Sequence, residues 1–206
     1  MPGWMAWTGE VSSLMTRPNA DCDLSFVLRC RDDEERIGHT IQRIASHLRG
    51  LGLNFELLLC DEGSGDNTLA VAALLRSAHL ELEIVHAAAG HGLLAGAERA
   101  RGRIVVAFDV RSEAPLAALG YALGRLERGL DVVALGGRFL TFRRTRALRA
   151  FDALAGSRNP RALERRFVRR ARALGLPAAV THPKRERILE KLRSVLAVPR
   201  ALSFLL

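Results

Sequence analysis

Two hydrophobicity patterns alternate along the first two thirds of the chain. Short runs of consecutive apolar residues are typical of strands buried on both faces, and the longer segments between them repeat apolar residues at helical spacing. Strands that alternate with helices predict βαβ units and a mainly parallel sheet. The predicted strands cover residues 24–30, 55–60, 82–85, 104–108 and 132–135, with a short edge strand at 177–180.

The predicted helices lie between these strands. The first ends at Gly50, because glycine is the usual residue just past a helix. The second begins after a cap at Asp66 or Asn67. Two more are expected over residues 93–100 and 116–126.

The chain changes character after Phe139. Residues 140–175 are rich in arginine and predicted to be helical, and a last amphipathic helix has its apolar stripe at 188–196. We expect that helix to dock on the sheet, although a basic amphipathic helix is also the form of a membrane-surface anchor. The predicted organisation is a leader over residues 1–22, a core over 23–139 and a basic helical extension packed on the core over 140–206.

The composition fits one globular domain. The chain has 206 residues, and a hydrophobic content of 49% is enough to fill a core. No stretch approaches the roughly 18 apolar residues that span a bilayer, and we expect no signal peptide. Cys22, Cys30 and Cys60 are odd in number and lack CxxC spacing, which favours reduced thiols over disulfides or a zinc site. We therefore expect a cytoplasmic protein.

Basic side chains gather in the C-terminal third. Residues 1–140 hold 14 basic and 18 acidic side chains, whereas residues 141–206 hold 17 basic and 4 acidic ones. Such a concentration would attract phosphates, an anionic membrane or nucleic acid. Nucleic acid is disfavoured, because this region has few aromatic side chains to stack on bases. The alternative is that the arginines merely solvate helix faces.

Carboxylates stand directly after two of the predicted strands. Asp61 follows the second strand and opens an acidic turn with several glycines, and Asp109 follows the fourth strand. Because α/β folds bind ligands at the carboxyl ends of parallel strands, these positions define a candidate site. The alternative for Asp61 is an ordinary helix or turn cap.

Five segments, in order and at matching spacing, resemble one family. Residues 26–37 resemble the opening V-I-P-x-Y-N-E-E-x-R-I of family 2 glycosyltransferases, and residues 56–68 resemble their E-I-I-V-V-D-D-G-S-T-D-N-T. Residues 90–102 are similar to their G-x-G…A-x-G segment, 105–111 to the strand ending in D-x-D, and 131–139 to the D-V-V-x-G-S-R-F of polyprenyl-phosphate sugar transferases. The resemblance covers about residues 23–139. It implies an α/β fold of the GT-A class, with three α/β/α layers around a mainly parallel sheet, and a nucleotide-sugar donor.

The resemblance also implies a role for each matching residue. Asp109 would be the catalytic carboxylate and would approach the diphosphate through Mg²⁺ or Mn²⁺, which prefer carboxylate and phosphate oxygens. Glu113 is the candidate second metal ligand, and Arg111 and Arg138 are candidates for contact with phosphate or acceptor. The implied nucleotide-binding residues are Arg29, Arg31, Asp32, Glu34, Asp61, Gly63, Ser64 and Gly90.

Two departures from the motifs affect this chemistry. Arginines replace the proline and the tyrosine of P-x-Y-N, and Asp109-Val110-Arg111 replaces D-x-D. Either Arg111 neutralises the diphosphate in place of a metal, or the site does not bind the donor.

Two functional hypotheses follow. The first is a glycosyltransferase that moves a sugar from a UDP- or GDP-sugar to an acceptor such as a polyprenyl phosphate at the inner face of the membrane. The second is a catalytically inactive GT-A domain that acts as a binding or scaffold protein.

Overall fold

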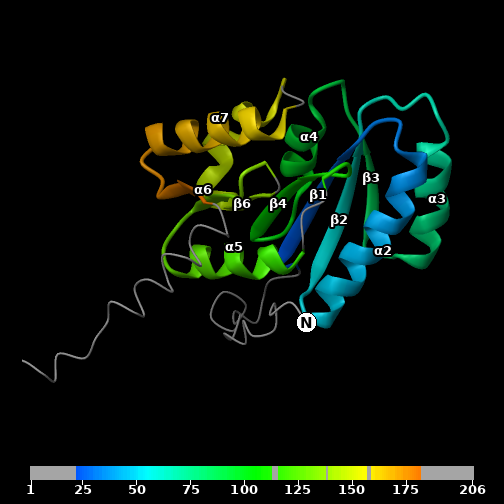
Figure 1. Ribbon diagram of the computed structural model, residues 1–206, viewed down its shortest axis with the longest axis horizontal. Coiled ribbons are helices and arrows are strands. Elements are labelled where there is room, and N and C mark those ends of the chain that lie inside the picture. The colour runs from blue at the N-terminus through cyan, green and yellow to red at the C-terminus, as the bar shows by residue number, and fades with distance from the viewer. Residues whose placement is uncertain (1–21, 113–115, 138, 157–158, 182–206) are drawn as a thin grey trace, which may run out of the picture.

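A seven-stranded sheet runs through the computed structural model, which describes residues 22–112, 116–137, 139–156 and 159–181. The strand order is β3-β2-β1-β4-β6-β5-β7 (Figure 1). The strands are β1 Leu24–Cys30, β2 Phe55–Asp61, β3 Leu82–His86, β4 Ile104–Asp109, β5 Val132–Ala134, β6 Leu140–Arg143 and β7 Ala178–Val180. The helices are α2 Glu34–Gly50, α3 Thr68–Ala78, α4 Gly92–Arg99, α5 Ala117–Glu127, α6 Arg144–Ala147, the 3₁₀ helix η1 Leu148–Leu154, and α7 Pro160–Ala173.

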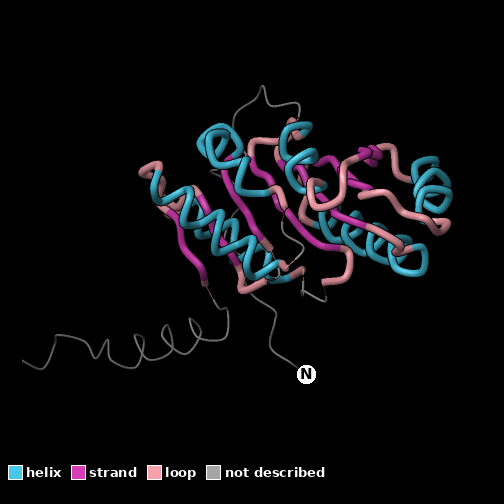
Figure 2. The backbone as a smooth tube through the Cα atoms, turned by 90° about the horizontal axis from the view of Figure 1, so that it is seen from above, coloured by secondary structure: helices cyan, strands magenta, loops and turns pink. Residues whose placement is uncertain are grey.

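Helices cover both faces of the sheet, as the tube view shows (Figure 2). The apolar residues of α2, α3 and α5 pack with one face of the strands in a first core cluster. Those of α4, α6, η1 and α7 pack with the other face in a second cluster. The predicted three-layer α/β/α arrangement is therefore confirmed.

Most strand pairs are parallel, as predicted, and β6 is the exception. It lies antiparallel between β4 and β5. The expectation that residues 140–175 are all helical is wrong at Leu140–Arg143, which form β6. Phe142 of β6 packs against Phe151 and Phe167, with ring centroids 5.6 and 4.9 Å apart, so burial of aromatic surface outweighs the polar sequence around it.

The strand order reverses between β1 and β4. The chain runs from β1 through β2 to β3 on one side, and it then crosses to β4 on the other side of β1. The register places Arg29 opposite Asp109 and Cys30 opposite Asp61. Parallel α/β sheets bind ligands at such a switch point, outside the carboxyl ends of the strands.

Several predictions concern residues outside the described part. These are the leader, except for Cys22, and the last amphipathic helix.

The three cysteines are free and buried. Among the described residues, no helix combines the length and hydrophobicity that crossing a bilayer requires.

Candidate functional site

An open pocket of about 360 Å³ lies at the carboxyl ends of β1, β2 and β4. It brings together five of the residues predicted from the sequence: Arg29, Arg31, Asp32, Asp109 and Arg111. Cys30, Asp33 and Glu62, which the sequence analysis did not select, complete its lining. The other predicted residues are not in the lining. Glu34, Asp61, Gly63, Ser64 and Gly90 lie at or just after the carboxyl ends of β1, β2 and β3, and Arg138 and Glu113 lie outside the described residues.

Asp109 forms an ion pair with Arg29 across the β1–β4 register. Nε of Arg29 donates to Oδ2 of Asp109 at 3.1 Å, and a terminal guanidinium nitrogen contacts the same oxygen. The other carboxylate oxygen, Oδ1, accepts the backbone N–H of Arg111 at 2.9 Å. Arg29 is only 5% exposed, so the pair is largely shielded from water. Both oxygens of the predicted catalytic carboxylate are therefore engaged by groups of the protein.

Arg111 connects the end of β4 to the loop between β1 and α2. Its Nε donates to Oδ1 of the buried Asp33 at 2.8 Å, and a terminal nitrogen donates to the carbonyl of Arg31 at 2.6 Å. The hydrogen bond to Asp33, followed by the charge of that carboxylate, raises the pKa of Arg111 above its ordinary value. The Arg111 side chain as a whole remains more than half exposed and lines the pocket. It is thus both a clamp on the loop and an accessible cation.

Asp32 and Glu34 join the β1–α2 loop to the β2–α3 loop. Oδ1 of Asp32 accepts the N–H of Gly65 at 2.7 Å, and its own N–H donates to the hydroxyl of Ser64 at 3.0 Å. Glu34 accepts the N–H of Asn67 at 2.8 Å. These bonds hold Asp32 at a φ of +52°, a conformation that costs energy for residues other than glycine. The two loops that form one wall of the pocket are consequently fixed to each other.

Asp61 is buried and bonded within its own turn. Its carboxylate accepts the backbone N–H groups of Gly63 and Ser64 at 3.1 and 3.2 Å, together with the Ser64 hydroxyl. This is the turn-capping role that the sequence left open as the alternative. A contact between Asp61 and a nucleotide base stays a prediction.

Glu62 is one of the three lining residues that the sequence analysis did not select. It is 3% exposed, and its two oxygens accept the N–H of Gly90 at 3.0 Å and that of Gly92 at 2.9 Å. It therefore fixes the Gly-His-Gly turn before α4 to the end of β2. The signal was its position, since it occupies the second acid of the D-D-G-S pattern.

The groups around Asp109 do not suit a divalent cation. A cation site needs free carboxylate oxygens, whereas both oxygens of Asp109 accept hydrogen bonds and Arg111 stands at the second ligand position. Within the described ranges, no group of three or more histidine, cysteine, aspartate or glutamate side chains could hold a metal ion. The Mg²⁺ or Mn²⁺ implied by the family motif therefore does not fit the residues that the structure describes, which do not include the candidate ligand Glu113.

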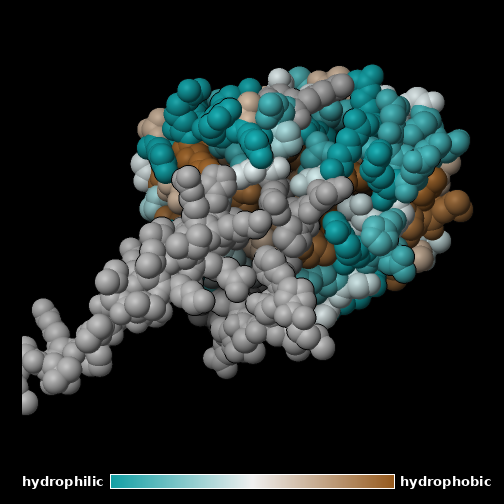
Figure 3. Space-filling view, viewed as in Figure 1, coloured by the Kyte–Doolittle hydropathy of each residue, from teal (hydrophilic) through white to brown (hydrophobic). Residues whose placement is uncertain are grey.

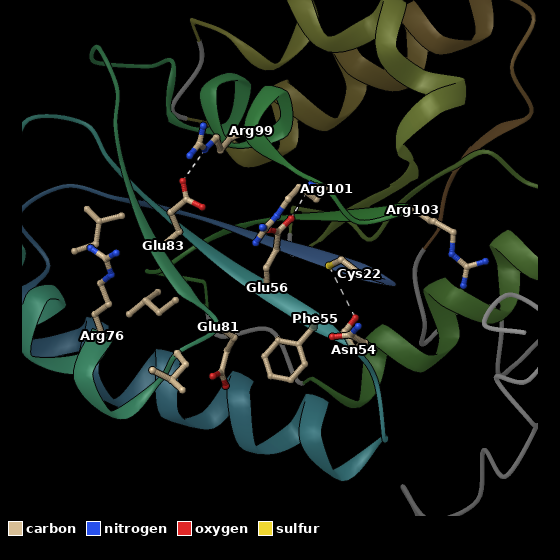
Figure 4. A pocket seen from close by; sticks show the side chains of 13 residues that line it. Cys22, Asn54, Phe55, Glu56, Arg76, Glu81, Glu83, Arg99, Arg101 and Arg103 are labelled. Atoms are coloured by element: carbon tan, nitrogen blue, oxygen red, sulfur yellow. Dashed lines mark hydrogen bonds and ion pairs between the residues drawn. The ribbon is translucent and has the colours of Figure 1, made fainter. Parts of the chain in front are cut away.

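A larger hollow of about 1080 Å³ lies at the opposite, amino ends of the strands (Figure 4). Its charged side chains are largely paired with one another. Arg99 donates to Glu83 at 2.6 Å, and Arg101 donates to Glu56 at 2.8 Å (Figure 4). Because ligands of parallel sheets bind at the carboxyl ends, we place the candidate site in the smaller pocket.

The sheet order and the pocket at its switch point define an α/β fold of the GT-A class, which solved glycosyltransferases share. A mannosyltransferase from Pyrobaculum calidifontis, PcManGT, was solved with GDP-Man and Mn²⁺. It matches with a TM-score of 0.59 at 15% identity, over 84% of this chain and 60% of that one. Glucosyl-3-phosphoglycerate synthase from Mycobacterium tuberculosis, solved with Mn²⁺, UDP and phosphoglyceric acid, matches with a TM-score of 0.58 at 17% identity. That match covers 88% of this chain and 81% of the other.

The chain belongs to glycosyl transferase family 2, whose family model matches residues 25–184. A curated relative is the undecaprenyl-phosphate 4-deoxy-4-formamido-L-arabinose transferase of Enterobacter sp. (strain 638), which is 26% identical over 156 residues. The match covers 72% of this chain and 48% of the relative, so the chain spans about half the length of that protein. The family and the fold class predicted from the sequence are confirmed.

Proposed function

We propose that the protein binds a UDP- or GDP-sugar in the 360 Å³ pocket and transfers the sugar to an acceptor. The observation that carries this proposal is the register of β1 and β4, which sets Arg29 opposite Asp109 at the switch point of the sheet. The solved relatives support the donor class, since PcManGT was solved with GDP-Man and TarS of S. aureus with UDP-GlcNAc.

In this proposal, residues of the pocket lining and predicted residues outside the lining each bind one part of the donor. Arg31 is half-buried at the position of the motif tyrosine, where a planar guanidinium can stack on the base. Asp61, Gly63, Ser64 and Gly90 are assigned to the base and its surroundings, and Asp32 and Glu34 to the ribose. Arg111 binds the diphosphate, Asp109 orients the reacting groups, and Arg138 contacts phosphate or acceptor.

We propose a polyprenyl phosphate as the acceptor, because the curated relative is named for an undecaprenyl-phosphate substrate. The phosphate oxygen of such an acceptor is already ionised at neutral pH and attacks the sugar directly. A strong protein base is then unnecessary, which agrees with the scarcity of acids after β6.

An arginine stripe on α7 supports a peripheral position on an anionic membrane surface. Arg161, Arg165, Arg169 and Arg172 are exposed and recur at spacings of four, four and three, so they lie along one side of the helix. The upper left of the space-filling view, over α7, is strongly hydrophilic (Figure 3). Pro160 at the start of α7 lines a small cavity with Arg29 and Asp109, so the stripe begins beside the site. An anionic bilayer bound there would present its lipid phosphates next to the pocket.

Vesicle sedimentation tests the membrane contact. The variant Arg165→Glu/Arg169→Glu should bind phosphatidylglycerol-containing vesicles on the order of 25-fold more weakly than the parent, because each arginine near an anionic surface is worth about a factor of five. The control Arg76→Glu/Arg128→Glu makes the same charge change at exposed positions on other elements. The membrane role of the arginine stripe would be contradicted if the parent bound neutral vesicles as tightly as anionic ones. It would also be contradicted if the control variant lost as much affinity for anionic vesicles as the α7 variant.

Calorimetric titration with UDP, GDP and their sugars tests the donor site. We expect binding of one nucleotide class, and we expect Asp109→Ala to abolish sugar transfer. The scaffold hypothesis has one observation in its favour, which is that the acids of the pocket are already paired. Transfer by the parent protein would exclude it, whereas absence of nucleotide binding under every condition would overturn the glycosyltransferase proposal.

A further inference from the structure

The two departures from the family motifs meet at one carboxylate. Arg29 replaces the motif proline in β1, and Arg111 replaces the second acid of D-x-D just past the end of β4, 82 positions further along the chain. The β1–β4 register brings both to Asp109, where Arg29 bonds the carboxylate through its side chain and Arg111 through its backbone N–H. The two motif substitutions therefore form one cluster of bonded side chains around Asp109, and they are not independent losses of family residues.

The charges of this arrangement match those of a metal-loaded D-x-D site. In a metal-loaded D-x-D site, the two negative carboxylates and the divalent cation together have no net charge. Here two carboxylates, Asp109 and Asp33, face the guanidinium groups of Arg29 and Arg111, and Arg36 also reaches Asp33 at 3.6 Å, so both carboxylates are neutralised without a metal. A divalent cation added to this cluster would introduce two excess positive charges and would have to displace a guanidinium from the carboxylate that it needs.

We propose that the guanidinium groups of Arg29 and Arg111 take the place of the divalent cation, so that the donor diphosphate binds without metal. This inference rests on the proposed donor site. Arginine suits the task because its planar, permanently charged fork donates several hydrogen bonds to phosphate oxygens. Asp109 holds Arg29, and Asp33 holds Arg111, so both cations are oriented before the ligand arrives. The exposed guanidinium of Arg111 offers the first contact.

The same groups would act on the leaving diphosphate. When the bond between the sugar carbon and the diphosphate oxygen breaks, its electron pair stays on that oxygen, and the acceptor phosphate oxygen forms the new bond to the sugar carbon. The charge that develops on the diphosphate is stabilised by N–H donors already in position. The step needs no further reactant.

Two measurements on the parent protein test the inference. We expect UDP or GDP to bind with the same affinity in excess EDTA and in Mn²⁺, within about twofold. We also expect the electron paramagnetic resonance signal of free Mn²⁺ to persist when the protein is added. Nucleotide binding that requires Mn²⁺ would overturn the inference and leave the proposed function standing. No nucleotide binding in either buffer would overturn the proposed function, and the inference with it.

Variants at Arg111 test whether its guanidinium is responsible for metal-independent nucleotide binding. Arg111→Lys keeps the positive charge but loses the planar set of guanidinium N–H donors, and Arg111→Asp recreates the D-x-D sequence. In EDTA we expect nucleotide affinity to fall at least tenfold in Arg111→Asp and less in Arg111→Lys, because charged hydrogen bonds are lost. Arg76→Asp, at an exposed position on α3, is the matched control and should change affinity less than twofold. Unchanged affinity in both Arg111 variants, with circular dichroism confirming their folding, would overturn the assignment.

Discussion

Glu62 lines the pocket and also accepts two hydrogen bonds from the backbone of a distant turn. Its removal would leave two buried N–H groups, those of Gly90 and Gly92, without their acceptor. We expect Glu62→Ala to lower the free energy of unfolding by about 3 kcal/mol, because unsatisfied buried donors pay their full desolvation cost. The midpoint of urea unfolding, at unchanged slope, measures this loss.

Glu98 supplies the control for that measurement. It is exposed near the end of α4, six residues after Gly92, and Glu98→Ala should change the free energy of unfolding by less than about 0.5 kcal/mol. If both variants unfolded at the same urea concentration, the anchoring role of Glu62 would be refuted.

Glu56 makes the stability of the fold dependent on pH. Burial alone would raise its pKa, but hydrogen bonds from the Ser25 hydroxyl and from the backbone and guanidinium of Arg101 outweigh burial and lower the pKa below 4.5. A group with a lowered pKa in the folded state stabilises the protein above its unfolded pKa and loses that contribution as pH falls through the folded pKa. We expect the parent to be more stable than Glu56→Gln at pH 7, and the gap in melting temperature to narrow as the pH is taken below about 4.5. A gap that stayed constant down to pH 3 would contradict this account.

At the level of single residues, the sequence predicted five of the side chains that line the pocket but not the bonds between them. The motifs placed Arg29, Asp109 and Arg111 near one another because each follows or precedes the end of a strand. The Arg29–Asp109 pair depends on the β1–β4 register, and strand register is not encoded in either strand alone. Glu62 escaped selection because its partners are backbone N–H groups of a distant turn.

At the level of elements, α4 depends on one glycine. A Cβ added to Gly96 would lie 2.7 Å from Sγ of Cys60 and would also collide with Val27. We expect Gly96→Ala to lower the free energy of unfolding by about 2 kcal/mol through overpacking against β1 and β2. Chemical unfolding of the single variants Gly96→Ala and Val27→Ala and of the double variant should show a favourable coupling of at least about 0.5 kcal/mol.

Gly38 in α2 is the matched control, since nothing lies within 4 Å of an added Cβ there. Gly38→Ala should stabilise the protein by about 0.5–1 kcal/mol, because alanine loses less entropy in a helix interior. Destabilisation of both variants by the same amount would show that helix propensity, and not contact with the sheet, is being measured.

Elements with strong periodicity were predicted well, and the failure at β6 has a physical cause. β1 is buried along its full length, so its apolar run could be recognised from the sequence. β6 has four residues, ends in arginine and continues directly into the arginines of α6. Its strand conformation is imposed by the neighbouring β4 and β5, a tertiary effect that local pattern cannot show.

At the level of the whole molecule, two cores share one sheet, and each core contains one buried cysteine. Cys30 belongs to one cluster and Cys60 to the other. Burial, with help from nearby carboxylates, raises the pKa of all three thiols, that of Cys60 to about 12. We expect no thiol to react with a disulfide reagent at pH 8 in the native protein and all three to react in urea, because thiolates are the reactive species.

Stopped-flow labelling at rising urea concentrations extends this test. If the described part of the chain unfolds as one unit, Cys30 and Cys60 should become reactive at the same urea concentration. Reactivity of one thiol well before the other would show that the two sides of the sheet open separately.

β3 ends the sheet on one side and so presents a free strand edge within the described part of the chain. Such an edge is a template on which another polypeptide can add a strand. Glu83 on β3 and Glu81 just before it form ion pairs with Arg99 and Arg49, and charged side chains along an edge strand oppose its pairing with a second copy. This protection is electrostatic, and at about 1 M salt the Debye length shrinks to about 3 Å. Concentrated, high-salt stocks are therefore where strand-mediated self-association should first appear, and dilute, low-salt buffers should keep the protein monodisperse.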